Sequence, residues 1–402
     1  MADSKKVLMV MPHMIGGGAE RVAAQLMNKL NERGWDTRFL LTRTKKDELV
    51  CTDLNEHTQL ILLSEELRKE SAAQQLVYFP LRIYSTVFGK LFEKMGKYVP
   101  ASVGKASVLW QHHREIRWLK NYLLQFPDMS VIVFLQPAIP IVMLAAQKLP
   151  NRVLFSERGD PKRLMKKRCG RRFVAKFYAR ADAAVFQTQD AKAAYPEEIA
   201  KKGTVICNPV KADLPEPYFG ERNLNITTFC RISKQKNLPL LLKAFSEVHK
   251  KHPEYTLRII GDAANDEGKA VLQSLYETVS AAALENAVSF EPFTKKIHES
   301  VLKDAMYVNS SDYEGISNAM LESMAIGMPV VCTDCPIGGA KETIADGENG
   351  LLVPIGDAQA LANAINRVIE DPAFAESLGK NASAKRDELS LDRIAARWEA
   401  LL

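Results

Sequence analysis

Short apolar runs alternate with stretches of helical periodicity along most of this chain. Val7–Met11 is an uninterrupted apolar run, typical of a strand that is covered on both faces of a sheet. Ala19–Asn31 then carries apolar residues three and four positions apart, as one face of a helix does. The alternation stops in residues 208–217, which contain prolines and little periodicity, and restarts at residue 226. The pattern predicts two parallel, doubly wound α/β domains joined near residue 208.

The other elements follow the same alternation. Further strands are expected at residues 37–42, 59–63, 131–135, 153–156, 183–187, 204–207, 226–230, 256–260, 288–291, 305–309, 330–332 and 350–353. Helices are expected at residues 77–98, 108–126, 238–249, 269–283, 358–369 and 373–402, the last with a break near residue 390. At 402 residues, two domains are the usual expectation.

Charge is divided unevenly between the two halves. Residues 1–200 hold 32 Lys and Arg against 20 Asp and Glu, whereas residues 201–402 hold 22 against 28. We therefore expect the first half to meet an anionic partner. The densest basic stretch carries no acid between Pro161 and Ala181; its cations are Lys162, Arg163, Lys166, Lys167, Arg168, Arg171, Arg172, Lys176 and Arg180.

Two interpretations of these basic segments stay open. For residues 161–181, a lipid diphosphate or an anionic membrane surface is favoured over a merely solvated helix. The helix expected from Val77 is amphipathic and basic, and packing on the sheet is favoured there over a membrane surface. Nucleic acid is disfavoured, because no nucleic-acid motif is present.

Several classes are excluded by composition. The longest apolar run, residues 131–146, is interrupted by Gln136, Pro137 and Pro140, so no spanning helix is expected. The N-terminus lacks the pattern of a signal peptide. Cys332 and Cys335 form a Cys-x-x-Cys pair without a second pair or matching histidines, which argues against zinc. We expect a cytoplasmic protein with reduced thiols.

Residues 312–331 predict a loop, a helix and a strand. Ser317 is the expected N-cap, Gly327 the left-handed residue that ends the helix, and Pro329 prevents its continuation. Glu314 falls just before the helix and Glu322 inside it. The backbone N–H groups of Gly315, Ile316, Ser317 and Asn318 suit an anion. Two ordinary surface carboxylates are the plain alternative.

A second anion-binding candidate opens the chain. Gly16, Gly17 and Gly18 lie between the first strand and the first helix, where a helix N-terminus is placed for a phosphate. The spacing is not Gly-x-Gly-x-x-Gly, and a tight structural turn is an equal alternative.

The stretch from Asp312 to Val331 resembles the paired-glutamate motif of the retaining GT-B glycosyltransferases called family 4. Several further segments also resemble that family: residues 16–21, 229–238, 259–262, 292–293, 336–342 and 346–353. The likeness is dense over residues 225–360 and sparse in the first half, where it rests on residues 7–21 and 153–161.

The resemblance implies a GT-B fold, in which two Rossmann-like domains face each other across a cleft. Residues 1–207 would bind the acceptor and residues 208–385 the donor, and a helix at about 386–402 would pack back on the first domain. Arg231 and Lys236 would hold the donor diphosphate, whose charges their side chains match. Glu314 would accept hydrogen bonds from the sugar and Glu322 from the ribose.

The same resemblance assigns supporting roles. The glycines at 16–18 would approach the donor from across the cleft. Gly261 belongs to the family's strand–turn segment, and Phe293 would frame the base. Many family members carry a histidine where this chain has Arg158, and an arginine cannot serve as a base. Asp160 and His13 are then the alternatives for the acceptor hydroxyl.

The expected function is retaining, metal-independent transfer of a hexose or N-acetylhexosamine from a nucleoside diphosphate sugar, UDP-linked by preference. The expected acceptor is a lipid-linked saccharide at the inner membrane face, in surface polysaccharide assembly, and no separate cofactor is expected. A non-catalytic nucleotide-sugar-binding subunit that partners an active transferase is the alternative. A dinucleotide-dependent oxidoreductase is disfavoured, because no Gly-x-Gly-x-x-Gly follows either first strand.

Overall fold

The computed structural model describes residues 5–14, 17–44, 53–69, 111–136, 138–161, 165–166 and 174–402. These residues form two compact units. The first combines the described part of Met1–Gln187 with Ala191–Ile206 and Ala395–Leu402, and the second combines Thr188–Asp190 with Cys207–Ile394. The expected helix from Val77 lies outside the described residues.

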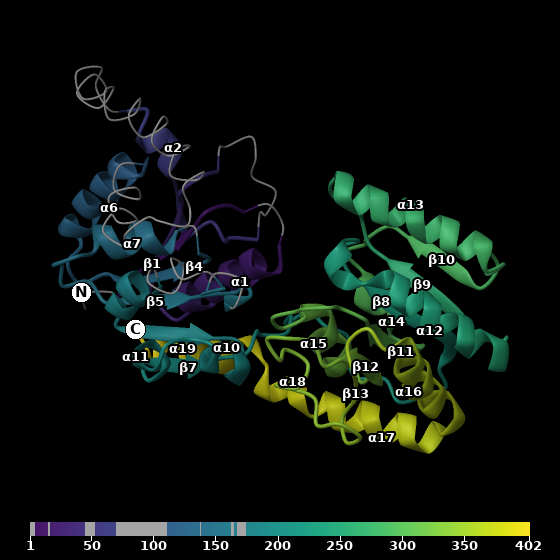
Figure 1. Cartoon of the computed structure of the whole chain (residues 1–402). Helices are drawn as coiled ribbons and strands as arrows, with labels where there is room; N and C mark the ends of the chain where they lie inside the picture. The colour runs from purple at the N-terminus through teal and green to yellow at the C-terminus, as the bar shows by residue number, and fades with distance from the viewer. Residues whose placement is uncertain are drawn as a thin grey trace. The chain divides into compact units, whose positions relative to one another are not determined.

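The first unit is built on a parallel sheet with strand order β3-β2-β1-β4-β5-β6-β7 (Figure 1). Its strands are β1 (Lys6–Met11), β2 (Asp36–Leu41), β3 (Gln59–Leu62), β4 (Ser130–Phe134), β5 (Val153–Ser156), β6 (Ala183–Phe186) and β7 (Gly203–Val205). Its helices include α1 (Gly18–Glu32), α2 (Leu63–Glu66), α6 (His113–Gln125), α7 (Ile139–Ala145), the 3₁₀ turn η2 (Tyr178–Arg180), and α11 (Glu197–Ala200). The short α10 (Gln189–Ala193) is shared between the two units.

The second unit is built on another parallel sheet, with strand order β10-β9-β8-β11-β12-β13. Its strands are β8 (Asn223–Phe229), β9 (Thr256–Ile260), β10 (Val288–Glu291), β11 (Asp304–Asn309), β12 (Val330–Thr333) and β13 (Leu351–Val353). Its helices are η3 (Lys234–Lys236), α12 (Leu238–Lys251), α13 (Asp266–Ala281), α14 (Ile297–Val301), α15 (Asn318–Ala325), α16 (Ala358–Glu370), α17 (Pro372–Ser383) and α18 (Lys385–Glu388). The predicted doubly wound α/β class is confirmed.

Local sequence explains most element boundaries. The helix α15 begins after Ser317, whose hydroxyl accepts a hydrogen bond from the Met320 N–H. It ends at Ala325, and Gly327, two residues further on, has a positive φ of 78°. Both features were expected from the cap and stop residues. The helix α7 was not expected, because its all-apolar sequence shows no helical periodicity and is entirely buried.

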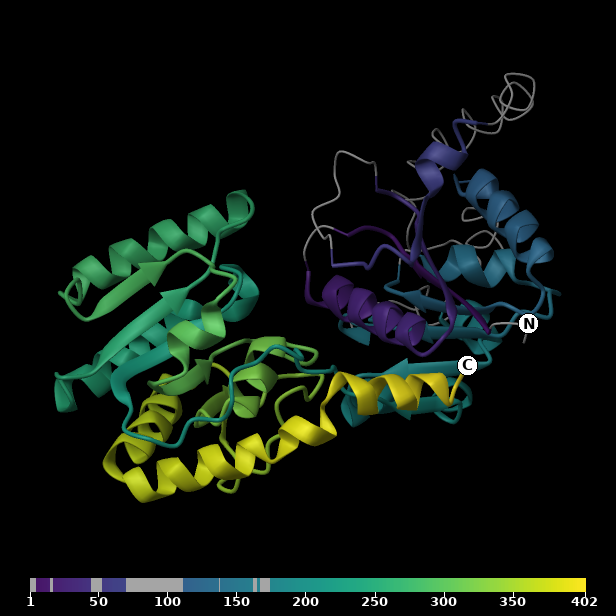
Figure 2. The same ribbon diagram turned by 180° about the vertical axis from the view of Figure 1, so that it is seen from behind.

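The last helix, α19 (Leu391–Glu399), ends inside the first unit. The Trp398 ring packs on Phe134 at a centroid distance of 5.6 Å, and the Glu399 carboxylate accepts hydrogen bonds from Arg33 and Trp35. Figure 2 shows this yellow helix beside the strand β7, to which the Arg397 side chain is hydrogen-bonded. The contact between this end of the chain and the first sheet therefore has both apolar and charged components.

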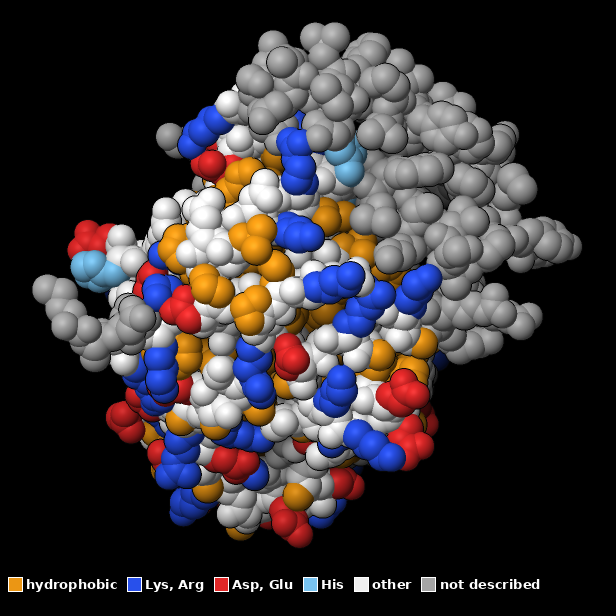
Figure 3. Space-filling view, turned by 90° about the vertical axis from the view of Figure 1, so that its left-hand side faces the viewer, with side chains coloured by type: hydrophobic (Ala, Val, Ile, Leu, Met, Phe, Trp, Pro, Cys, Tyr) orange, Lys and Arg blue, Asp and Glu red, His pale blue; other side chains and the backbone are white. Residues whose placement is uncertain are grey.

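The helices and the surface of the described part show two further features. None of its helices has both the length and the apolar character that a membrane span requires. Lys and Arg side chains lie across the middle of the face drawn in Figure 3, among apolar side chains and with few acids between them.

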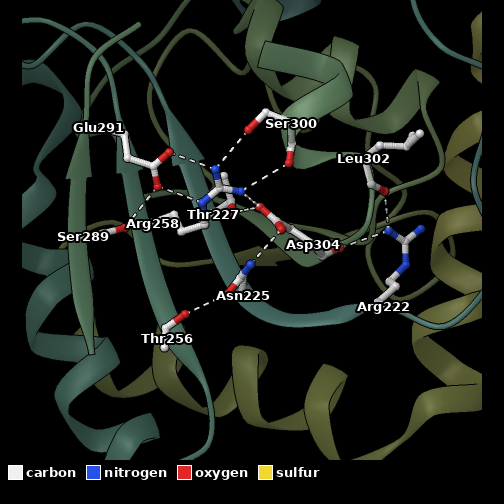
Figure 4. Close-up of polar contacts among 10 residues, drawn as sticks. All are labelled: Arg222, Asn225, Thr227, Thr256, Arg258, Ser289, Glu291, Ser300, Leu302 and Asp304. Carbon is white, nitrogen blue, oxygen red and sulfur yellow. Dashed lines mark hydrogen bonds and ion pairs between the residues drawn. The ribbon is translucent and has the colours of Figure 1, made fainter. Parts of the chain in front are cut away.

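A polar network joins four strands of the second sheet (Figure 4). The Asp304 carboxylate is fully buried and lies 2.6 Å from the Arg258 guanidinium, and it also accepts hydrogen bonds from Asn225 and Thr227. Arg258 reaches the Glu291 carboxylate through two parallel hydrogen bonds of 2.8 and 2.9 Å. The network fixes β8 and β11 relative to each other and to β9 and β10.

Removing the buried carboxylate should destabilise the second unit strongly. We expect Asp304→Ala to lower the free energy of unfolding by about 3–5 kcal/mol, because it leaves the buried side of Arg258 without its counter-ion. The matched change Glu291→Gln, at the more exposed end of the network, should have a smaller effect. Far-UV circular dichroism during urea unfolding measures both variants, and equal losses would contradict this account of the network.

Candidate functional site

In the second sheet, the strand order reverses beside β8. The chain runs from β8 outward to β9 and β10, then returns to β11 on the other side of β8. In open α/β sheets, ligands bind outside the carboxyl ends of the strands at this reversal, because the two loops there diverge. The expected ligand position therefore lies beyond Phe229 and Asn309, the last residues of β8 and β11.

An ion pair joins the two loops that follow β8 and β11. The Lys236 ammonium group lies 2.5 Å from the Glu314 carboxylate, and the Ser311 hydroxyl donates to the same carboxylate oxygen at 3.3 Å. Burial disfavours the charge of Lys236, but the attraction of Glu314 outweighs that effect and raises the pKa of the lysine. Lys236 is therefore protonated at neutral pH, and it provides a positive charge that is fixed in position.

The two loops that carry this pair are hydrogen-bonded together. The Asp312 N–H donates to the Gln235 carbonyl at 3.0 Å, and the Gln235 side chain donates to the Tyr313 carbonyl at 2.9 Å. The Asn237 side chain donates to the Asp312 carboxylate at 2.6 Å. A site held in place before ligand arrives loses less free energy to ordering when it binds.

The segment before α15 lies against a glycine turn. A β-carbon on Gly339 would lie 1.4 Å from the Gly315 carbonyl oxygen, so only glycine allows this close approach. Ile316 and Ser317 are buried, and the Ser317 hydroxyl caps α15. Ser317 can therefore reach a ligand through its backbone more readily than through its side chain. Asn318 is half-buried and accepts a hydrogen bond from Asn208.

Glu322 lies in the second turn of α15, and its carboxylate is paired with a histidine. The His298 Nε2 atom lies 2.8 Å from the Glu322 Oε2 atom, and the two side chains are 7% and 4% exposed. The His298 ring also meets Phe229 edge-on at 5.9 Å, which places the pair beside the carboxyl end of β8.

The other residues expected to bind the donor take different positions. The side chains of Arg231 and Phe293 are exposed, and Phe293 is 54% exposed. Gly261 has a φ of 150°, and a β-carbon there would lie 1.9 Å from the Cys230 carbonyl oxygen. The need for glycine at 261 is therefore explained by packing between two strand ends.

In the first sheet, the order reverses beside β1, and a histidine follows that strand. The His13 Nδ1 atom lies 2.8 Å from the carboxylate of Glu20, which is buried in the first turn of α1. The Gly17 N–H also donates to Glu20, and Gly18 begins the helix. A buried carboxylate that orients a partly exposed imidazole is an arrangement suited to proton transfer. Gly16 lies outside the described residues.

Arg158, at the end of β5, packs on aromatic rings. Its guanidinium carbon lies 4.3 Å from the Phe134 ring centroid and 5.9 Å from that of Trp398. Such stacking is a common structural use of arginine. Asp160 follows two residues later and is half-buried. The expected position of Arg158 in the catalytic site, in place of a histidine, and the expected role of Asp160 at the acceptor hydroxyl remain predictions.

The basic stretch 161–181 falls largely outside the described residues. Of its cations, only Lys166, Lys176 and Arg180 are described, and Arg180 is exposed. The predicted anionic acceptor site there stays a prediction.

A cavity of about 530 Å³ lies in the first unit, at the amino-terminal ends of β5 and β6. Lys148, Asn151, Arg152, Arg180 and Asp182 are among the residues that line it. It is separated by the length of β5 from the carboxyl ends where α/β sheets bind their ligands, so it does not belong to the site described above.

The second unit matches a known family. Residues 218–385 match the family model described as Glycosyl transferases group 1. Arg231, Lys236, Glu314 and Glu322 all lie within the matched residues.

Two curated proteins are similar to part of the chain. It is 27% identical over 278 residues to the exopolysaccharide phosphotransferase SCO2592 of Streptomyces coelicolor. The matched stretch covers 68% of this chain and 28% of that protein. It is 29% identical over 172 residues to the N-acetylgalactosamine-N,N'-diacetylbacillosaminyl-diphospho-undecaprenol 4-alpha-N-acetylgalactosaminyltransferase of Campylobacter jejuni, which covers 42% and 44%. The chain thus spans less than half the length of each.

Among solved structures, the chain is similar to Anabaena Alr3699/HepE in complex with UDP-glucose. The TM-score is 0.71 at 19% identity, and the match covers 99% of this chain and 100% of that one. At this identity the likeness concerns the fold. The chain has the GT-B fold, and residues 218–385 of its second unit match a glycosyltransferase family model.

Sequence reasoning missed two partners in these sites. Glu20 was assigned no role beside His13, and His298 was not considered. Glu20 lies seven residues from His13, a spacing that indicates contact only when the turn between them is known. His298 lies 24 residues before Glu322 and on another helix, so no local signal could have found it.

A buried carboxyl beside Arg158 gives a pH-dependent prediction. Glu157 accepts hydrogen bonds from two backbone N–H groups and from Tyr178, but burial raises its pKa above the usual range. The folded state therefore binds the proton of the Glu157 carboxyl group more tightly than the unfolded chain does. The resulting stabilisation is complete below the unfolded pKa of about 4.3 and is lost as pH rises through the folded value.

Glutamine cannot ionise, so Glu157→Gln should gain stability relative to the natural protein as pH rises from about 4 towards 7, by about 1.4 kcal/mol for each unit of pKa shift. All four tryptophans fall in the first unit's residue ranges, so tryptophan fluorescence follows its unfolding. The exposed Glu198→Gln is the control. A stability difference that stays constant with pH would contradict the raised pKa.

Proposed function

We propose that this protein transfers a sugar from a nucleoside diphosphate donor to a hydroxyl acceptor. The observation that carries the proposal is the Lys236–Glu314 pair, held at the strand reversal of a unit that matches a glycosyltransferase family. A fixed cation at that edge suits a diphosphate, and a carboxylate beside it suits sugar hydroxyls.

In the proposed donor complex, Lys236 and the exposed Arg231 neutralise the diphosphate, together with backbone N–H groups of residues 315–318. Glu314 accepts from the sugar and Glu322 from the ribose, while Phe293 lies against the base. A UDP-linked donor is the first choice, and the UDP-glucose complex of the Anabaena structure supports it by analogy of fold.

In the proposed reaction, the acceptor oxygen bonds to the anomeric carbon, and the bond from that carbon to the diphosphate oxygen breaks. The electron pair leaves with the nucleoside diphosphate, whose developing charge Lys236 and Arg231 stabilise. His13, oriented by Glu20, takes the hydroxyl proton, with Asp160 as the alternative. Retention of configuration and independence of metal ions are carried over from the resemblance to family 4.

The proposed acceptor is a lipid-linked saccharide used in surface polysaccharide assembly. Support comes from the name of the Campylobacter relative, which specifies a diphospho-undecaprenol acceptor, and from the excess of cations in residues 1–200. The proposed location is the cytoplasm, with the anionic inner membrane surface as a docking partner.

A second candidate is a nucleotide-sugar-binding subunit without catalytic activity of its own. The stacking of Arg158 on Phe134 and Trp398 favours it, because the resemblance to family 4 puts this arginine in the place of a histidine, and its side chain is engaged in packing. This candidate keeps donor binding and loses turnover.

Nucleotide release with UDP- and GDP-sugars, with and without bacterial lipid-linked saccharides, tests the reaction. We expect acceptor-dependent release of UDP that persists in EDTA. Lys236→Met should lower kcat about 10²–10³-fold, because it removes a fixed charge from the departing diphosphate. The exposed neighbour Lys234→Met is the control and should change little.

Different failures of this assay have different meanings. Tight UDP binding without turnover on any acceptor would favour the binding subunit. Turnover with GDP-mannose alone would overturn the UDP donor, and loss of turnover in EDTA would overturn metal independence.

The acceptor side gives a separate prediction. His13→Gln should lower kcat about 10²–10⁴-fold, because it removes the group that takes the proton from the acceptor hydroxyl. It should leave nucleotide affinity unchanged, because it removes no contact with the nucleotide sugar. Glu20→Gln should act in the same direction, and the exposed His57→Gln is the control. Unchanged turnover in His13→Gln, with a loss in Asp160→Asn, would transfer the role to Asp160.

A further inference from the structure

The buried pair of Glu322 and His298 carries an inference that rests on the proposed nucleotide-sugar donor. Glu322 is an acidic side chain that is almost completely buried, on a helix whose other buried side chains are apolar apart from Ser323. A carboxylate in that position is strongly disfavoured unless a partner compensates for its lost hydration. His298, at 2.8 Å, is such a partner.

The histidine is itself held in place. Ile297 and Val301, on either side of it in α14, are buried in the same apolar cluster as Phe229, and the imidazole meets the Phe229 ring edge-on at 89°. With the ring fixed, its Nε2 atom holds one oxygen of the Glu322 carboxylate and limits the orientations open to the group. Two adjacent hydroxyls are bound more tightly by a carboxylate whose orientation is set before they arrive, because less free energy is lost to ordering.

We propose that His298 is a positioning residue for the nucleotide ribose: it orients the Glu322 carboxylate so that this group receives the 2′- and 3′-hydroxyls of the donor. His298 does not touch the ligand and acts through Glu322 alone. The pair thereby makes the site selective for ribonucleotides over 2′-deoxyribonucleotides. Hydrogen bonds to a charged acceptor are worth enough for about a tenfold preference or more.

The test measures Kd by calorimetry for UDP and for 2′-deoxy-UDP, or for the guanosine pair if the protein binds GDP instead. We expect the natural protein to favour the ribonucleotide about tenfold or more, and His298→Phe to reduce this preference to near one. Glu322→Ala should lose the same preference, and the double variant should lose no more, because both residues act through one group.

Two further variants separate orientation from general damage. His298→Gln places an amide N–H near the position of Nε2 and should retain most of the preference. His252→Phe removes a second His–Glu pair, His252 with Glu370 at 3.1 Å, which lies at the far ends of α12 and α16, and should change nothing. If His298→Phe does not fold, His298→Asn, whose amide is too short to reach the carboxylate, replaces it.

The outcomes distinguish this inference from the proposed function. A natural preference that His298→Phe or His298→Asn leaves intact overturns the role of His298 and leaves the donor assignment standing. A preference that survives Glu322→Ala overturns the ribose assignment of Glu322 as well. A natural protein that binds no nucleoside diphosphate overturns the proposed function and this inference together.

Discussion

The second unit depends on keeping charged groups fixed at the carboxyl end of its sheet. Lys236 and Glu314 come from loops that follow different strands, and each needs the other because both are mostly buried. Their relative position depends on the spacing of β8 and β11, which the buried Asp304 sets through its contacts with Asn225 and Thr227. The polar network inside the sheet and the ion pair at its edge are thus parts of one arrangement.

The two units share one strand topology but carry different side chains at the point where the strand order reverses. In each, the strand order reverses beside the first strand, and charged side chains follow the strands next to that reversal. In the second unit these side chains are a cation and a carboxylate that suit a phosphorylated sugar. In the first unit they are His13 and Glu20, an arrangement that suits proton transfer. This difference agrees with the proposed reaction, in which the second unit would bind the sugar donor and the first unit the acceptor.

The sequence predicted the fold class and most strands because parallel strands are continuous apolar runs bounded by clear breaks. It also indicated Lys236 and Glu314, through the resemblance of residues 229–238 and 312–331 to motifs of the family 4 glycosyltransferases. It could not indicate His298 or Glu20, because their roles depend on contacts that packing creates between separate segments. It was equally unable to show that Arg158 stacks on Phe134 and Trp398, since Trp398 lies 240 residues further along the chain.

Hydrogen–deuterium exchange of the whole chain, with and without UDP, tests the central claim most directly. The account predicts that UDP slows exchange in residues 230–238 and 311–323, the loops after β8 and β11, because the ligand binds there and orders them further. Peptides that cover His13 and Glu20 should change less. Protection confined to the first unit, with none after β8 and β11, would contradict the account.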